Sequence, residues 1–212
     1  MKITTRSQQG ALRLPATQIS NLLDGQMTLF LRPWGSQDFN QKFIDEVTHY
    51  LSSAQADIDV TSPFDFHENL TSLSNKTRIA MLLAHDYFLK VENVNEFSVG
   101  FEATIFFHAK NELAWSSVGR FGLKKIQGEN VNTLFEAGVD RDDETLLPVQ
   151  LVGIEKEIEI QSGSLIFNAD IQLLLYSTYQ GEISTRPNGS DPLVIDAKNS
   201  ECIYWYSLIN AD

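Results

Sequence analysis

Cysteine and basic residues are scarce in this chain of 212 residues. A single cysteine, Cys202, excludes an intramolecular disulfide, and because it lies in the apolar run Cys-Ile-Tyr-Trp-Tyr we expect an inert strand position. Sixteen Lys and Arg against 28 Asp and Glu give a net charge of -12. The average field of such a chain repels phosphate polymers and anionic membrane surfaces, so we expect neither nucleic acid nor membrane as a partner.

Long apolar runs and linkers are also missing. No segment approaches the ~18 apolar residues of a membrane span, and residues 1–10 lack the apolar core of a signal peptide. We therefore expect a cytoplasmic protein. Because the sequence has no repeat and no Pro/Gly/Ser-rich linker, it predicts one domain over residues 1–212, with an irregular N-terminal segment over residues 1–26.

The common motifs of catalysis and ligand binding are absent as well. Neither GxxxxGK[ST] nor GxGxxG nor GxSxG occurs, which disfavours nucleotide-dependent folds and the common serine hydrolases. The four histidines are scattered without metal-ligand spacing, and the adjacent His85 and Asp86 are typical of a solvated helix face. The acidic run 140–144 lacks the glycine and final glutamate of a calcium loop, so we expect a solvated loop there.

Two helices are predicted from apolar spacing and start signals. Ser36 is a good N-cap, and Phe39, Phe43, Val47 and Leu51 follow at helical spacing. The segment Ser62-Pro63-Phe64-Asp65 predicts the start of a second helix, because serine caps, proline suits the first helical position and the acid faces the positive helix end. An apolar stripe then continues for about seven turns to Val91.

Strands account for most of the remaining pattern. Residues 99–109 alternate between apolar side chains and others with the two-residue period of a strand that has one buried face. Further strands are predicted at residues 27–31 (broken by Arg32-Pro33-Trp34-Gly35), 112–118, 121–127, 130–136, 156–160, 165–167, 171–176 and 203–209. Two long helices followed by many antiparallel strands indicate an α+β layered fold.

The order of these elements resembles the PP2C-type (PPM) metal-dependent protein phosphatases. The residues that carry the resemblance are the second helix and the segments 100–107, 113–119, 121–127, 147–153 and 173–177. Architecture carries the match over residues 27–209 more than identities do. The resemblance implies a four-layer α-β-β-α sandwich of two antiparallel sheets flanked by helices. It also implies two Mn²⁺ or Mg²⁺ ions, held by acidic side chains, that activate a water for attack on a phosphate monoester.

This chain departs from the family's pattern where the acids stand. The family's early strand ends in Asp-Gly, whereas residues 29–35 read Leu-Phe-Leu-Arg-Pro-Trp-Gly, and the family's Gly-Asp-Ser is replaced by Gly119-Arg120-Phe121. The terminal Asp-Asn is replaced by Asn199-Ser200-Glu201. The family's Ser-Asp-Gly aligns either with Ser177-Thr178-Tyr179 or with Ala169-Asp170-Ile171. Asp170 is thus the only surviving ligand that the resemblance offers, and it leaves no complete metal site and no catalytic residue.

These departures lead us to expect a catalytically inactive pseudophosphatase without a cofactor, which acts by contacts with a protein partner or by regulating one. Trp34 is a candidate for such contacts, because loops present contact residues and tryptophan is common at interface centres. The alternative for Trp34 is a side chain folded back on the first helix.

Two other interpretations remain open at this point. The chain is a metal-dependent Ser/Thr phosphatase, using Mn or Mg, if Asp24, Asp38 and Asp196 supply the ligands from displaced positions. It is an unrelated α+β binding domain if the resemblance reflects only a similar layering.

Overall fold

The fold is described from a computed structural model of the chain. The structure describes residues 1–9, 14–56, 62–136, 148, 150–179, 183–188, 191–197 and 203–211. Cys202, the acidic run 140–144 and Asn199-Ser200-Glu201 lie outside these residues.

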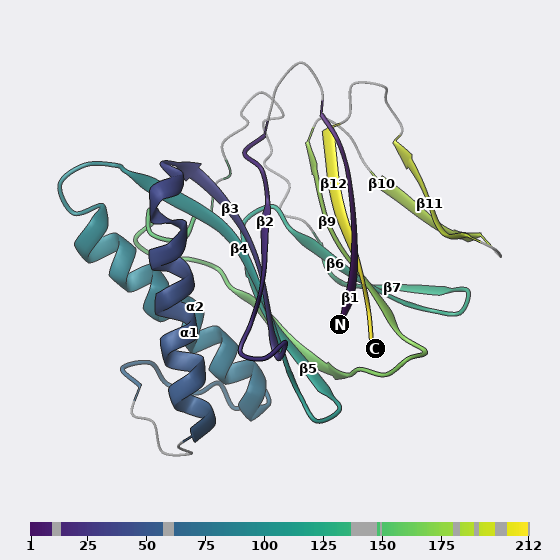
Figure 1. Ribbon diagram of the computed structural model, residues 1–212, viewed down its shortest axis with the longest axis horizontal. Coiled ribbons are helices and arrows are strands. Elements are labelled where there is room, and N and C mark those ends of the chain that lie inside the picture. Colours follow the sequence, from purple (N-terminus) through teal and green to yellow (C-terminus); the bar gives the residue numbers. More distant parts are fainter. Residues whose placement is uncertain are drawn as a thin grey trace. The chain divides into compact units, whose positions relative to one another are not determined.

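The chain divides into two compact units, whose elements Figure 1 labels. Unit 1 consists of Met1–Leu14, Arg120–Pro148 and Phe167–Asp212, and unit 2 consists of Pro15–Gly119 and Val149–Ile166. The prediction of one domain over residues 1–212 stays a prediction.

Unit 2 contains a five-stranded antiparallel sheet in the order β2-β3-β4-β5-β8. Its strands are β2 (Gln18–Leu22), β3 (Met27–Gly35), β4 (Val99–Ala109), β5 (Glu112–Val118) and β8 (Gln161–Ile166). β3 and β4 pair over their whole common length, from Met27 opposite Phe107 to Gly35 opposite Val99. This long pairing makes β3 and β4 the centre of the unit.

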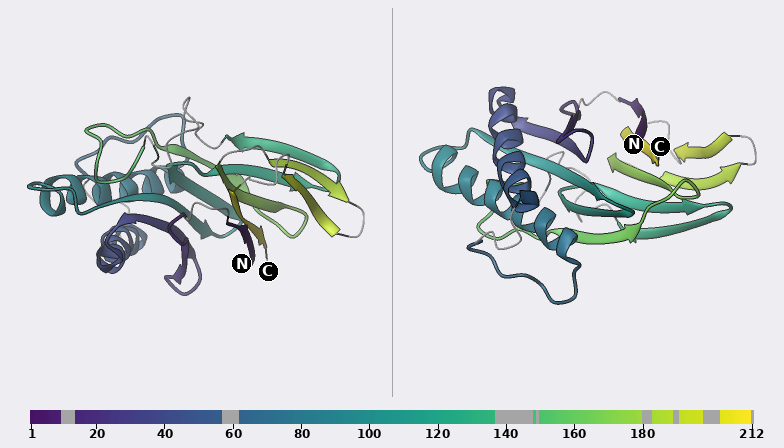
Figure 2. Two further views of the ribbon diagram at one scale, coloured as in Figure 1. Left: turned by 90° about the horizontal axis from the view of Figure 1, so that it is seen from above. Right: turned by 60° about the horizontal axis from the view of Figure 1, so that its bottom comes forward.

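Two helices pack on one face of this sheet (Figure 2). The first begins as a short 3-10 turn, η1 (Gln37–Phe39), whose cap Ser36 accepts a hydrogen bond from the Asp38 N–H, and continues as α1 (Asn40–Ala56). The second is α2 (Ser72–Tyr87), which passes into a π-helical turn, η2 (Phe88–Glu92). Among the described residues, no helix is long and apolar enough to cross a membrane.

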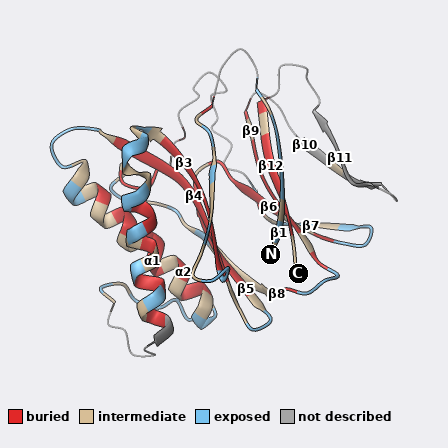
Figure 3. Ribbon diagram, in the orientation of Figure 1, coloured by how far each residue is buried: buried red, intermediate tan, exposed pale blue. Residues whose placement is uncertain are grey.

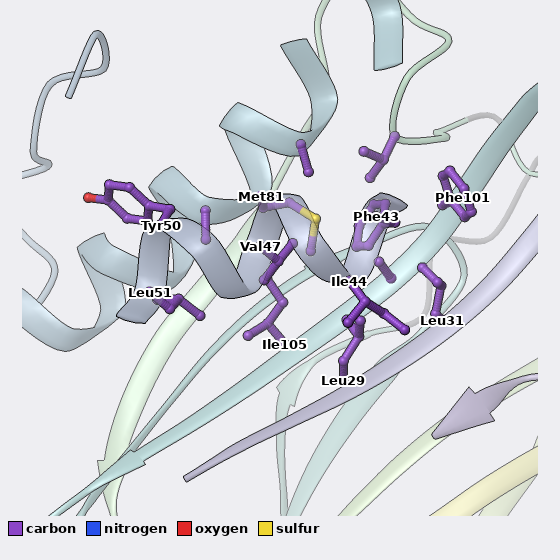
Figure 4. Packing of buried hydrophobic residues seen from close by; sticks show 14 of the residues in the cluster. Leu29, Leu31, Phe43, Ile44, Val47, Tyr50, Leu51, Met81, Phe101 and Ile105 are labelled. Carbon is purple, nitrogen blue, oxygen red and sulfur yellow. The ribbon is translucent and has the colours of Figure 1, made fainter. Parts of the chain in front are cut away.

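The core of unit 2 lies between the helices and the sheet. Figure 4 shows side chains of α1, α2, β3 and β4 meeting in this layer, and the Phe43 ring lies 4.8 Å from that of Phe101 and 5.9 Å from that of Phe88. The apolar positions predicted at helical spacing on the first helix, Phe43, Val47 and Leu51, are all fully buried here. Burial of such a stripe against a sheet is what stabilises helices of this length.

Unit 1 contains the second five-stranded antiparallel sheet, in the order β1-β12-β9-β6-β7. Its strands are β1 (Lys2–Gln8), β6 (Gly122–Gln127), β7 (Asn130–Phe135), β9 (Gln172–Tyr179) and β12 (Ile203–Asn210). A hairpin of β10 (Ile183–Asn188) and β11 (Asp191–Ala197) belongs to the same unit. Two antiparallel sheets together with helices confirm the predicted α+β class, and both described helices belong to unit 2.

Several sequence predictions hold and others are corrected. The strands at 99–109 and 112–118 have the predicted bounds. The segment 1–26, predicted to be irregular, contains β1 and β2, because both pair with more apolar strands although none of their own side chains is fully buried. The strand predicted at 156–160 is absent, and that segment lies outside any ladder.

The second helix begins later than predicted. Ser72, not the segment after Ser62, starts α2, because the Thr71 hydroxyl caps the helix by accepting from the Ser74 N–H. The side chain of Asn75 also bonds the backbone N–H and C=O of His67, which fixes the preceding segment in a non-helical path. The Thr71 cap and the contacts of Asn75 thus determine where the helix begins.

β3 continues through Pro33, where the sequence predicted a break. Pro33 stands opposite Phe101, whose backbone N–H and C=O both bond Val152 on the other side of β4. The missing N–H of proline therefore leaves no donor or acceptor of β4 unmatched.

β4 also differs from its prediction, because residues 99–107 are buried on both faces and not on one (Figure 3). One face carries Phe101 and Ile105 toward the helices. The other carries Glu102 and Thr104, which are fully buried too. This second face of β4 holds the polar cluster described next.

Candidate functional site

A buried ion pair joins the two central strands of unit 2. Arg32 on β3 and Glu102 on β4 are direct cross-strand partners, and the Arg32 Nη1 lies 3.0 Å from the Glu102 Oε2. Their side chains are 1% and 0% exposed. Since Leu31 and Phe101 point toward the helices, the alternation of side chains along a strand places this pair on the opposite face of the sheet.

Two neighbouring side chains also form hydrogen bonds with the pair. The Trp34 indole N–H donates to the same Glu102 oxygen at 2.9 Å, and the Arg32 Nε donates to the Thr17 hydroxyl at 3.2 Å. Trp34 is half-buried, two residues beyond Arg32 on the same face of β3. The Glu102 carboxylate therefore holds a cation and an indole at once, which is the condition for a buried charge to be stable.

Gly119 packs directly on this carboxylate. Its φ of +101° lies in the region that favours glycine, and a Cβ atom there would stand 2.5 Å from the Glu102 Cγ. Any larger residue would displace Glu102 from its donors. Gly119, which aligns with the glycine of the family's Gly-Asp-Ser segment, thus leaves the space that the Glu102 side chain occupies.

The residue after Gly119 carries a second buried cation. Arg120 begins the part of the chain that belongs to unit 1 and is 8% exposed, and its guanidinium lies 4.6 Å from the centre of the Tyr179 ring. A guanidinium over an aromatic face is a favourable cation–π contact.

The candidate ligand Asp170 lies in an exposed turn before β9, where its backbone N–H donates to the Asn168 Oδ1 at 3.1 Å. The end of β9 reads Ser177-Thr178-Tyr179. Of the two alignments left open, the structure places the one without an acid at the strand end and Asp170 near the strand start.

The acids of the relocated-ligand alternative are dispersed. Asp24 is exposed in the turn between β2 and β3, and Asp38 is exposed beside its hydrogen-bond partner Ser36. Asp196 lies on β11, in the other unit. In the part of the chain that the structure describes, no group of three or more His, Cys, Asp or Glu side chains could hold a metal ion.

His85 also differs from its prediction of a solvated position. It is 6% exposed, and its Nδ1 accepts a hydrogen bond from the Gly153 N–H at 3.0 Å. Burial lowers the pKa of His85, while the Asp86 charge acts in the opposite direction. The neutral ring is thereby used to hold the segment around Gly153, whose own φ is +88°.

Similarity to known proteins is found in the fold and not in the sequence. No protein-family model matches the sequence, and no curated protein matches it either. Among solved structures, the PPM Ser-Thr phosphatase MsPP from Mycobacterium smegmatis is similar with a TM-score of 0.58, at 11% identity, over 100% of this chain and 99% of that one. The chain has the fold of the PPM phosphatases.

Other structures with the PPM fold agree. PppA, described as a key regulatory component of T6SS in Pseudomonas aeruginosa, gives a TM-score of 0.54 at 11% identity over 99% and 97% of the two chains. The catalytic domain of the phosphatase PstP, solved with two manganese ions, gives 0.53 at 14% identity over 100% and 98%. The interpretation as an unrelated α+β domain is therefore set aside.

The acids of unit 2 that the structure describes do not form a set of ligands for the pair of divalent ions that the PPM fold implies. Such ions are held by several oxygen ligands, chiefly carboxylates. The buried carboxylate of unit 2, Glu102, is already bound by Arg32 and Trp34, and Arg32 brings a fixed positive charge to its side.

Glu102 was not among the site residues predicted from the sequence. Its signal was a single charged residue inside the long alternating strand 99–109, matched by a single charged residue, Arg32, in an otherwise apolar strand. Lone opposite charges in two buried strands indicate a cross-strand pair, but only if the two strands are known to be neighbours.

Proposed function

We propose that this chain is a pseudophosphatase: a protein with the PPM fold that has lost metal-dependent catalysis and acts through contacts with a protein partner. It would sequester a phosphoprotein or regulate its partner without hydrolysing phosphate. Trp34 was predicted as an interaction residue, and its bond to Glu102 supports a different primary role, that of holding the buried carboxylate.

The observation that carries the proposal is the buried pair of Arg32 and Glu102. Arg32 lies in the segment 29–35, which resembles the family's strand ending in Asp-Gly and carries no acid. Its guanidinium is fully buried and is bound by Glu102 and Thr17. A buried cation in a segment where the family carries an acid supports the loss of metal binding.

Electrostatics support the same conclusion. A buried carboxylate that is neutralised by an arginine at 3.0 Å has no net charge left with which to attract a divalent cation. Displacing Arg32 from Glu102 would break a buried ion pair, at a cost of several kcal/mol. The residues of unit 2 thus favour the ion pair over a metal.

The competing function is a Ser/Thr phosphatase with ligands from displaced positions. It draws support from PstP, whose structure holds two manganese ions in the same fold. The described residues of this chain offer no gathering of acids in its favour.

A phosphatase assay tests the proposal. The purified chain is incubated with p-nitrophenyl phosphate and with a phosphothreonine peptide in excess Mn²⁺, beside the Asp170→Asn variant and a blank. We expect the same background rate from all three. Turnover that saturates with Mn²⁺ and is abolished by Asp170→Asn would overturn the proposal and establish the enzyme.

Location and partner class belong to the same proposal. The net charge of -12 disfavours nucleic acid and anionic membranes as partners, which leaves a protein partner, and the proposed location is the cytoplasm. A fluorescently tagged chain expressed in cells of its source checks the location. Recovery with membranes after high-salt washing would contradict it.

A further inference from the structure

A groove of about 540 Å³ lies on the surface of unit 2 between α1 and the α2–η2 helix. On α1 it is lined by Glu46, His49, Tyr50 and Ser53, which share one helix face because they are spaced by three or four residues. This face flanks the core, since Val47 and Leu51 beside it are fully buried. In Figure 4 the hydroxyl end of Tyr50 points away from the other labelled core side chains.

The opposite wall repeats the pattern. Leu83, Tyr87 and Val91 recur every four residues along α2 and η2 and supply apolar surface, while Asp86 and Lys90 form an ion pair with each other on the same wall. The two helices run in opposite directions, because Lys42 near the start of α1 bonds Glu92 at the end of η2 and Lys76 near the start of α2 bonds the Ala54 C=O. A groove between two such neighbouring helices, with apolar side chains along one wall, can receive a third, amphipathic helix.

Apolar surface extends beyond the groove. Val91 is 55% exposed although it lines the groove, and it is followed along the chain by Val94 and Phe97, which are 61% and 57% exposed. Three large apolar side chains exposed within seven residues are typical of an interaction surface.

The charges at the groove leave an excess of one acid. Asp86 pairs with Lys90, and Glu92 is bonded by Lys42 at 2.8 Å and by the Tyr87 hydroxyl at 2.6 Å. Glu46 has no hydrogen-bond or ion-pair partner among the described residues.

The acids near the groove also affect the pKa of Tyr87. Its hydrogen bond to Glu92, its desolvation, and the charges of Glu92 and Glu46 raise the pKa of Tyr87 to about 12. A cationic group is therefore the complement of this groove.

We propose that the groove between α1 and α2 binds an amphipathic helical segment of a partner protein, whose apolar face packs on Leu83, Tyr87 and Val91 and whose Lys or Arg pairs with Glu46. A second copy of this chain is a poor occupant, because each copy carries a net charge of -12. The inference rests on the proposed function only in taking protein contact as the mode of action.

The probe is a fluorescein-labelled 14-residue peptide with leucines on one helical face and lysines on the other, beside a matched peptide with glutamate in place of each lysine. Fluorescence anisotropy measures binding to the chain. We expect the lysine peptide to bind and the glutamate peptide not to. Equal affinity for the two peptides, or binding of neither, would overturn the inference.

Variants locate the binding. Glu46→Gln should raise the Kd of the lysine peptide by about three- to fivefold, as for a surface ion pair, while Glu68→Gln, an exposed acid outside the groove with the same change in charge, should not. Val91→Ser should raise it about tenfold, against no change for Ile166→Ser on β8. Circular dichroism verifies that each variant is folded.

The other outcomes separate the two proposals. If sedimentation shows self-association that Val91→Ser removes, the occupant is a second copy and the inference is wrong. Mn²⁺-dependent turnover in the phosphatase assay would overturn the proposed function and leave the peptide result standing. Failure of the peptide tests would refute helix binding in the groove and leave the pseudophosphatase proposal intact.

Discussion

Replacing Glu102 by glutamine should lower the free energy of unfolding by about 3–5 kcal/mol, the range for a buried ion pair that loses one partner. Glutamine has the same shape and keeps an oxygen that can accept from the Trp34 indole. The loss therefore comes from the charge, because the guanidinium of Arg32, buried at 1% exposure, no longer faces the negative charge of Glu102. Against the 5–15 kcal/mol typical of a domain, this is a large fraction of the total stability.

Urea denaturation, followed by circular dichroism and tryptophan fluorescence, measures this loss. Glu96→Gln removes an exposed carboxylate with the same change in net charge and should stay within about 0.5 kcal/mol of the unchanged chain. The double variant Arg32→Met, Glu102→Leu should recover most of the loss and leave a deficit of about 1–3 kcal/mol for the indole N–H that lost its acceptor. The reasoning is refuted if Glu102→Gln costs under 1 kcal/mol, or if the double variant costs as much as the two single changes added.

Three further predictions concern the same unit. Phe43→Ala should cost about 3–5 kcal/mol, because it empties a fully buried position between the rings of Phe88 and Phe101, and an unchanged urea midpoint would contradict that packing. Gly119→Ala should destabilise by several kcal/mol, since φ is +101° and the new Cβ would meet Glu102; a stable variant would show that the carboxylate can move. Because burial lowers the pKa of His85, the unfolded chain takes up its proton first, so stability should be full above pH about 6.5 and fall as the pH drops below that value. Urea midpoints at pH 7.5 and 5.5 measure this loss of stability. The loss should be smaller in His85→Asn, whose side chain accepts a hydrogen bond but does not titrate. An equal loss in the two proteins would contradict the prediction.

Elements with long, regular patterns could be predicted from the sequence. The strand 99–109 was assigned with the observed bounds, because eleven residues of alternation are a strong signal and the Lys110-Asn111 turn closes it. The first helix was placed at Ser36 for a similar reason, since a cap directly precedes the apolar spacing.

Predictions from short sequence signals were wrong where another contact determined the local structure. Pro63 favoured a helix start, yet the Thr71 cap and the Asn75 side chain determine where α2 begins. Pro33 favoured a strand break, yet the bridge from Phe101 to Val152 makes its missing N–H harmless. Phe101 and Val152 lie far from Pro33 in the sequence, outside the reach of a short-range pattern.

The sequence predicted only that the candidate site lacks acidic metal ligands, and not which residues form it. The absence of an acid in residues 29–35 was read from the sequence, but the partner that makes Arg32 stable lies 70 residues away, on β4. The groove between α1 and α2 was likewise invisible, because its walls come from two helices whose faces meet only in the folded chain.

The claim that an arginine–glutamate pair stands in place of metal ligands is tested most directly by X-ray diffraction from crystals soaked in Mn²⁺, recorded at the manganese absorption edge. We expect the Arg32 guanidinium to remain on Glu102, with no anomalous peak at that carboxylate or at Arg120. Two peaks about 3.5–4 Å apart with carboxylate ligands, as in two-metal sites, would contradict the account.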